Sequence, residues 1–158
     1  MVTIRLTQDF KEFLSLLNSK QVEYLVIGGY AVATYGYVRP TKDIDVWIAV
    51  SEQNLHRLVD ALIAFGFPPS AVTVEVFKSD KSVFRMGYPP NRLEILTRIT
   101  GVDFQECYQR RGAAEIDGLS VPVISLGDLL ANKTAAGREQ DRVDVAKLKQ
   151  FHGKSRPA

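Results

Sequence analysis

Two aspartates separated by one isoleucine, Asp43 and Asp45, begin the otherwise apolar run DIDVWI. Successive side chains of a β-strand point to opposite faces, so both carboxylates lie on one face while Ile44, Val46 and Ile48 lie on the other. Two ionised carboxylates this close repel each other unless a cation or a raised pKa relieves the repulsion. The run therefore predicts a strand with one face in the core and an acidic, ion-binding face on the other side.

A strand, a glycine turn and a helix precede these acids. Residues 24–27 are apolar and predict a short buried strand, Gly28 and Gly29 follow, and the next residues have helical spacing. A turn without β-carbons lets phosphate oxygens approach the backbone N–H groups, and the start of the helix favours their negative charge. Adjacent glycines after a strand are also found in ordinary tight turns, so the glycines carry weight only together with the acids.

The residues available to a metal site are oxygen donors. The chain has two histidines and one cysteine, Cys107, so it lacks the residues of a zinc site, a Cys/His nucleophile or an internal disulfide. Carboxylates without a nearby histidine or cysteine favour Mg²⁺ or Mn²⁺. We expect Cys107 to be a small packing residue.

Length and charge limit the remaining possibilities. We assign residues 1–151 of the 158 to a single domain and residues 152–158 to a loose tail. No run approaches the ~20 apolar residues that cross a bilayer, and the first residues lack the layout of a signal peptide, so we expect a cytoplasmic protein without membrane contact. The formal charge of +2 is too small to indicate bulk nucleic-acid binding.

Periodicity and turn residues predict the other elements. The pattern predicts helices over residues 8–18, 52–65 and 104–111, strands over residues 72–77, 82–86, 92–97 and 121–124, and one interrupted helix or two successive helices over residues 126–151.

The spacing of Gly28-Gly29, thirteen residues and then Asp43-Ile44-Asp45 resembles the signature of the DNA polymerase β-like nucleotidyltransferase superfamily. The resemblance implies a third carboxylate from a later strand of the same sheet, and Glu94 in the run RLEILT is the candidate. The alternative for Glu94 is an edge-strand acid that faces solvent, although its apolar neighbours favour a strand with little exposure.

The segment VPVISLGDLLANKTAAGREQDRVDVAKL resembles the C-terminal part of small stand-alone nucleotidyltransferases and, more loosely, of abortive-infection (AbiEii-type) toxin enzymes. Lys133 matches the family lysine that reaches toward the nucleotide or its phosphates. Arg138, Asp141 and Asp144 match the charged pattern K-x4-R-x2-D-x2-D, and helical spacing would place these three along one face. For Arg138 and Asp141, an exposed helix with local ion pairs is an equally open interpretation.

Two cations lie beside the acidic strand. Arg39 can bind phosphate in a bidentate way, or it can form a salt bridge that balances the acids. Lys42, next to Asp43, is predicted to point away from the site into solvent. Two residues depart from the superfamily pattern: Tyr30 stands where many members have a serine that contacts the triphosphate, and Glu94 stands where aspartate is frequent.

These features predict an α/β (α+β) protein of the nucleotidyltransferase fold, a mixed sheet with helices packed on it. By resemblance, the chain would transfer a nucleoside monophosphate from a nucleoside triphosphate such as ATP to a hydroxyl group, with Mg²⁺ or Mn²⁺. Asp43, Asp45 and Glu94 would be metal ligands and, with Lys133, catalytic residues. The predicted nucleotide-binding residues are Gly28, Gly29, Arg39, Lys133, Arg138 and Asp141.

The acceptor separates three hypotheses. The resemblance of the C-terminal segment implies a tRNA end or a protein, in a toxin–antitoxin or phage-defence system with a cognate antitoxin or toxin. A second hypothesis is a small hydroxylated compound, because small antibiotic nucleotidyltransferases share a similar Gly-Gly start and D-x-D strand. The third is a catalytically silent binding partner or antitoxin, suggested by Tyr30 and Glu94. A homodimer is open, since the sequence carries no specific interface signal.

Overall fold

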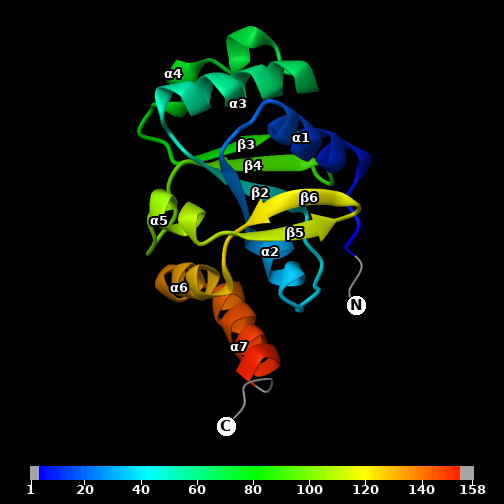
Figure 1. Ribbon diagram of the computed structural model, residues 1–158, viewed down its shortest axis with the longest axis vertical. Coiled ribbons are helices and arrows are strands. Elements are labelled where there is room, and N and C mark those ends of the chain that lie inside the picture. The colour runs from blue at the N-terminus through cyan, green and yellow to red at the C-terminus, as the bar shows by residue number, and fades with distance from the viewer. Residues whose placement is uncertain (1–3, 154–158) are drawn as a thin grey trace.

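A mixed six-stranded sheet with helices on both sides forms the protein in the computed structural model, which describes residues 4–153 (Figure 1). The strand order is β3-β4-β2-β1-β6-β5. The strands β2 and β4 are parallel, as are β1 and β6, and the other neighbours are antiparallel. The strands are β1 Tyr24–Ile27, β2 Asp43–Ile48, β3 Val83–Met86, β4 Arg92–Leu96, β5 Gly112–Ile116 and β6 Leu119–Val123. The predicted α/β class with a mixed sheet is confirmed.

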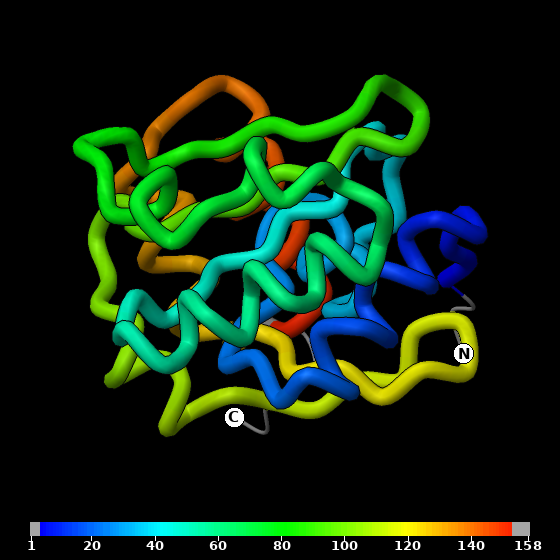
Figure 2. The backbone as a smooth tube through the Cα atoms, turned by 90° about the horizontal axis from the view of Figure 1, so that it is seen from above, coloured from blue at the N-terminus to red at the C-terminus, as the bar shows by residue number. Residues whose placement is uncertain are grey.

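The helices lie in two groups. From above, α3 lies in front of the strands and α7 behind them (Figure 2), and Figure 1 shows α3 with α4 at one end and α6 with α7 at the other. The helices are α1 Gln8–Ser19, α2 Gly28–Thr34, α3 Glu52–Phe65, α4 Val74–Phe77, α5 Phe104–Gln109, α6 Leu126–Ala136 and α7 Glu139–Gly153, with a 3₁₀ turn at Pro69–Ala71. None of the helices within residues 4–153 is long and apolar enough to cross a membrane.

Side-chain alternation along β2 separates the core from the site. Ile44, Val46 and Ile48 are fully buried, whereas Asp43 and Asp45 on the opposite face are only partly covered. Helix α1 carries its apolar stripe into the same core, where Phe13 packs edge-to-face on Phe65 of α3 with ring centroids 5.8 Å apart. The burial of one face and the partial exposure of the other are as the sequence predicts.

One buried side chain, that of Asn54, links the ends of β1 and β2 to α3. Asn54, 2% exposed, accepts a hydrogen bond from the Glu23 backbone N–H at 2.7 Å and donates to the Glu23 and Ala49 carbonyls at 3.0 and 2.7 Å. These backbone groups lie at the start of β1 and just after β2. Asn54 therefore satisfies groups that a buried strand end would otherwise leave unpaired.

One predicted strand is wrong. Residues 72–77 alternate apolar and polar side chains, but they form the end of a 3₁₀ turn followed by α4. Val74 and Phe77, three residues apart, are the buried pair of this short helix, and the Phe77 ring lies 4.9 Å from that of Phe84. A single helical turn over the edge of the sheet buries both side chains without any strand partner.

A strand that the sequence did not predict is β5, whose small residues have low strand propensity. It pairs with β6 across the turn at Asp117 and Gly118, which both have positive φ values of 51° and 79°. Asp-Gly is a strong hairpin signal and could have revealed the strand.

The C-terminal segment forms two helices and not one. Helix α6 ends at Gly137, whose N–H donates to the Lys133 carbonyl at 3.0 Å, and α7 begins at Glu139. Helix α7 continues through Gly153, so it includes two residues of the expected tail. The rest of that tail, residues 154–158, and residues 1–3 lie outside the described residues.

We expect Asn54→Ala to lower the free energy of unfolding by about 3 kcal/mol, because the Glu23 N–H and the Ala49 carbonyl lose their partner, whereas the Glu23 carbonyl keeps its bond from the Ala49 N–H at 3.2 Å. Asn132→Ala is the control, since Asn132 makes one exposed hydrogen bond to the Thr100 carbonyl at 2.9 Å. Urea unfolding followed by circular dichroism measures both. Equal losses for the two variants would contradict the role given to Asn54.

Candidate functional site

The three predicted carboxylates come together on neighbouring parallel strands. Asp45 of β2 is the register partner of Glu94 of β4, and Asp43 is the partner of Arg92. Strand β4 lies between β3 and β2, so Glu94 is on an interior strand and its side chain is only 17% exposed. The alternative of a solvent-facing edge-strand acid is therefore wrong.

Gly28 lets α2 approach the acids. A β-carbon on Gly28 would lie 2.1 Å from Oδ2 of Asp45, and the residue has a φ of +68°. A β-carbon on Gly29 would lie 2.5 Å from Oγ1 of Thr41, in the segment that leads into β2. Glycine is therefore required at both positions, because a larger side chain would clash with the strand that carries the acids or with the segment that leads into it.

The Asp45 carboxyl group has an unusual electrostatic environment. Burial raises its pKa to about 8, with a further contribution from the negative charges of Glu94 and Asp43, against the opposing charges of Lys133 and Arg138. Within residues 4–153 the Asp45 carboxylate has no hydrogen bond or ion pair. A partly buried carboxylate without a partner between two other acids has the environment that a cation would relieve.

The other two acids are paired with arginines. Arg92 donates from Nε and Nη2 to the two oxygens of Asp43 at 3.0 and 2.8 Å. Arg85 of β3 donates from Nε to Oε2 of Glu94 at 3.1 Å, and these two residues are register partners. Both arginines were missed by sequence reasoning. Arg92 could have been found, because strand alternation places it on the same face as Glu94.

The ligand atoms are of the chemical type that a hard divalent cation prefers. Three carboxylates in register on β2 and β4 offer only oxygen ligands, which suit Mg²⁺ or Mn²⁺. As the described residues stand, no three acidic, histidine or cysteine side chains converge closely enough to hold a metal ion. Arginines bind both oxygens of Asp43 and one oxygen of Glu94, so a metal ion would compete with these pairs.

Two adjoining cavities of about 390 and 480 Å³ open over these acids and together form what we call the acidic cleft. The larger one is lined by the glycine turn, by residues 39–43 and by several cations. The smaller one extends along β3 and β4 toward α6 and includes apolar side chains such as Leu96 and Ile99. Six residues line both cavities, namely Gly28, Asp45, Arg85, Glu94, Lys133 and Arg138.

A group of five charged side chains, three of them buried, lies at one side of the cleft. Lys133 of α6 is 5% exposed, and its Nζ lies 3.2 Å from Asp141 and 2.9 Å from Asp144. Arg39 donates to both oxygens of Asp144 at 2.8 Å. Arg138 donates to Asp141 from its backbone N–H at 3.1 Å and from Nε at 2.7 Å. We call these five residues the ion cluster.

The ion cluster changes the interpretation of four predicted site residues. Arg138 precedes α7 and is not on the helix face expected for it, because Asp141 caps the start of α7 through the Arg138 backbone. Arg39 forms a salt bridge, but its partner is Asp144 and not the acids of β2. Lys133 lines the cleft while its ammonium group is bound by two aspartates. Nucleotide binding by these residues and by Asp141 stays a prediction.

The sequence also singles out Tyr30 and Lys42. Tyr30 is 7% exposed and packs edge-to-face on Phe10 at 6.1 Å, so it is a core residue. Lys42 is exposed, as predicted, but it lines the larger cavity over the acids, so its predicted separation from the site is not confirmed.

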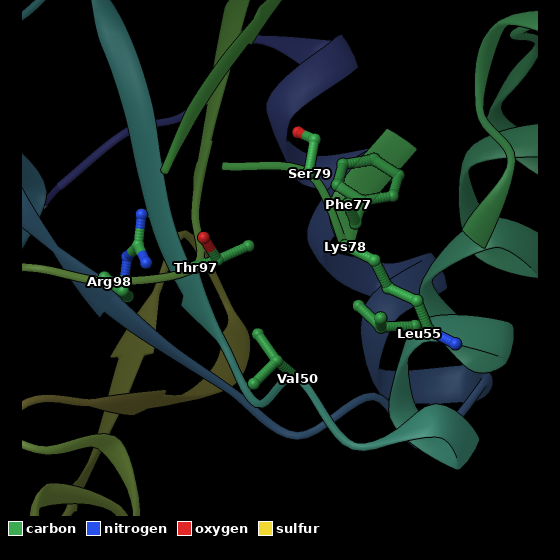
Figure 3. A pocket seen from close by; sticks show the side chains of 7 residues that line it. All are labelled: Val50, Leu55, Phe77, Lys78, Ser79, Thr97 and Arg98. Carbon is green, nitrogen blue, oxygen red and sulfur yellow. The ribbon is translucent and has the colours of Figure 1, made fainter. Parts of the chain in front are cut away.

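A separate pocket of about 270 Å³ lies beyond the opposite ends of β2 and β4. Figure 3 shows Leu55, Phe77, Lys78 and Ser79 along one side, with Val50, Thr97 and Arg98 along the other. It has no carboxylate in its lining, and the acids stand at the other ends of the same strands. The predicted site residues therefore line the acidic cleft and not this pocket.

Several solved structures with a similar fold are described as nucleotidyltransferases or nucleotidyltransferase-like proteins. The lincosamide antibiotic adenylyltransferase LnuA, bound to lincomycin, has a TM-score of 0.58 at 16% identity, over 94% of this chain and 99% of LnuA. An antigenic nucleotidyltransferase-like protein from Paracoccidioides brasiliensis has a TM-score of 0.52 at 18% identity, over 95% and 77% of the chains. A candidate nucleotidyltransferase from Thermotoga maritima has a TM-score of 0.51 at 16% identity, over 96% and 98%.

Sequence comparison identifies the family. No curated protein matches the chain. The model of a family described as nucleotidyltransferases of unknown function (DUF6036) matches residues 4–151, which is nearly the whole chain. The chain therefore belongs to the DUF6036 family of nucleotidyltransferases.

Proposed function

We propose that the acidic cleft transfers a nucleoside monophosphate from a nucleoside triphosphate to a hydroxyl group. The observation that carries the proposal is the register of Asp45 with Glu94 on adjacent parallel strands, directly against the glycine turn at Gly28. Membership of a nucleotidyltransferase family supports the same reaction class. The toxin-like relationship suggested by the C-terminal segment has no such support.

In the proposed reaction, Asp43, Asp45 and Glu94 would hold the divalent cation, which would supply Lewis-acid activation when bound. The acceptor oxygen forms a bond to the α-phosphorus as the bond to pyrophosphate breaks. We assign Glu94 as the group that receives the hydroxyl proton, because it stands across from Asp45 on the open face. Cations that line the larger cavity stabilise the charge on the phosphates.

The two cavities suggest how the substrates divide the cleft. The larger cavity, of about 480 Å³, is bounded by Gly28, Gly29, Arg39, Lys42 and Arg92, so we place the triphosphate there. The smaller cavity, of about 390 Å³, has both polar and apolar lining and is suited to a neutral or weakly charged acceptor. The volume is in the range of sites for small molecules.

A small hydroxylated compound is therefore our leading acceptor. The fold match to LnuA supports this choice, since that protein is a lincosamide antibiotic adenylyltransferase and is spanned over 99% of its length. The charged pattern of the C-terminal segment, which suggested a toxin enzyme, also has a structural explanation in the ion cluster.

An RNA acceptor is the second candidate, because a further groove adjoins Lys133. This groove, of about 480 Å³ between α6 and α7, is lined by Arg142 and Lys149 together with Val145 and Ala146. Two exposed cations beside the cleft would suit a phosphate backbone.

The test incubates the protein, Mg²⁺ and each of the four nucleoside triphosphates with three acceptors: lincosamides and aminoglycosides, total tRNA, and the protein itself. Intact mass spectrometry detects addition of one nucleoside monophosphate. A modified small molecule supports our leading acceptor, and labelled tRNA supports the second. Absence of Mg²⁺-dependent triphosphate binding would contradict the whole proposal and favour a silent binding partner.

We expect Asp45→Asn and Glu94→Gln each to lower the transfer rate at least ~100-fold, since each removes a charge that stabilises the reacting groups. Addition of EDTA should abolish transfer in the wild type. Asp60→Asn, an exposed residue of α3, is the matched control and should keep full activity. Full activity of Asp45→Asn in the radiolabelled transfer assay would rule out the carboxylate site.

We expect Gly28→Ala to lose nucleotide binding, because the added methyl group would occupy the position of the Asp45 carboxylate. Gly118→Ala is the control, since Gly118 also has a positive φ but has open space around its β-carbon position. Both substitutions should cost ~1–2 kcal/mol of stability through backbone strain. Isothermal titration with Mg²⁺ and each triphosphate separates them, and equal affinities would show that the contact with Asp45 is unimportant.

A further inference from the structure

Arg92 occupies both oxygens of a predicted metal ligand. Its Nε lies 3.0 Å from Oδ1 of Asp43 and its Nη2 lies 2.8 Å from Oδ2. A guanidinium bound in this forked geometry uses one lone pair on each oxygen and brings a positive charge to the carboxylate. Arg92 therefore competes with a metal ion for Asp43, because it neutralises the carboxylate and repels a second cation.

The surroundings of the pair distinguish it from a structural ion pair of the same type. Arg39 and Asp144 form an equivalent fork, but the Asp144 side chain is fully buried and is also bound by Lys133 and by Gln140. In contrast, the side chain of Arg92 is 33% exposed and that of Asp43 is 17% exposed. The Asp43 carboxylate has no other partner within residues 4–153. Such a partly exposed pair opens more readily than the buried Arg39–Asp144 pair, because water can replace the lost hydrogen bonds.

The location of Arg92 gives it a second partner when the pair opens. Arg92 lines the larger cavity beside Gly28, Gly29 and Lys42, where we place the triphosphate. Guanidinium groups bind phosphate oxygens in the same forked manner as they bind carboxylates. Arg92 can thus exchange a carboxylate for a phosphate without leaving the cleft.

We propose that Arg92 is an exchangeable counter-ion that pairs with Asp43 and moves to the phosphates when metal and nucleotide bind. The inference depends on the proposed function and names a residue of that site that sequence reasoning missed. Arg85 repeats the arrangement at Glu94 with a single hydrogen bond. Metal alone must displace Arg92 without offering it a new partner, whereas a metal–triphosphate complex supplies one.

The exchange makes metal binding and phosphate binding cooperative. We expect the wild type to bind Mn²⁺ alone weakly and to bind Mn²⁺ much more tightly with inorganic triphosphate, a probe that needs no knowledge of the base. Arg92→Gln should raise the affinity for Mn²⁺ alone ~10-fold and lower the affinity for triphosphate in the presence of Mn²⁺ ~10-fold, within the usual range of coupling between sites. Arg92→Lys keeps the positive charge but cannot form two parallel hydrogen bonds. Its affinities for Mn²⁺ and for triphosphate should therefore lie between those of the wild type and those of Arg92→Gln.

The matched control is Lys42→Gln, which removes the same charge one residue from Asp43 without opening an ion pair. It should raise the Mn²⁺ affinity at most ~2-fold, as expected for a solvated charge. Electron paramagnetic resonance of free Mn²⁺ and calorimetry with triphosphate give both affinities without an activity assay, and circular dichroism checks that each variant is folded.

The possible outcomes separate the exchange from the reaction. Equal Mn²⁺ affinities for Arg92→Gln and Lys42→Gln would overturn the exchange while the proposed function stands, provided that the wild type binds triphosphate with Mn²⁺. A wild type that binds neither Mn²⁺ nor triphosphate would overturn both. Opposite shifts of ~10-fold in the two affinities for Arg92→Gln, with a rise in Mn²⁺ affinity clearly larger than that for Lys42→Gln, support the exchange.

Discussion

The parallel pairing of β2 with β4 is the constraint on which the rest of the site depends. It places Asp45 across from Glu94 and Asp43 across from Arg92 within one open face of the sheet. The opposite face of β2 is fixed by the fully buried Ile44 and Val46, so a shift of one residue would move the acids into the core. Burial energy on one side of the sheet therefore determines the charge arrangement on the other.

Charged pairs around the cleft serve two different purposes. In the ion cluster, Asp144 is fully buried and binds Arg39, Lys133 and Gln140, so removal of one partner would leave a buried charge uncompensated. This group holds α6, α7 and the segment before β2 together. At the cleft itself, the side chains of Arg92 and Asp43 are partly exposed. Among the described residues, these two side chains form hydrogen bonds only with each other. The same chemistry is thus a fixed support in one place and a replaceable contact in another.

Much of the fold and the outline of the site were predictable from the sequence, because they depend on local patterns. The strand over residues 43–48, the helix over residues 52–65 and the glycine turn follow from periodicity and turn residues. The strand predicted at residues 72–77 was wrong because Val74 and Phe77 are buried equally well by a helical turn. Strand β5 was missed because its small residues have little propensity of their own and acquire strand geometry only through pairing with β6.

By itself, the sequence determined that Asp43 and Asp45 share one face of a strand that follows a glycine turn, since neighbouring residues in a strand alternate by geometry alone. Only the tertiary structure decided what those acids meet. Arg92 reaches Asp43 from 49 residues away, and Arg39 reaches Asp144 across 105 residues. Such partners are selected by strand register and by the position of α7 beside α6 and the segment that precedes β2. No local pattern specifies them, because each arginine could equally have paired with another acid in a different arrangement of the same elements.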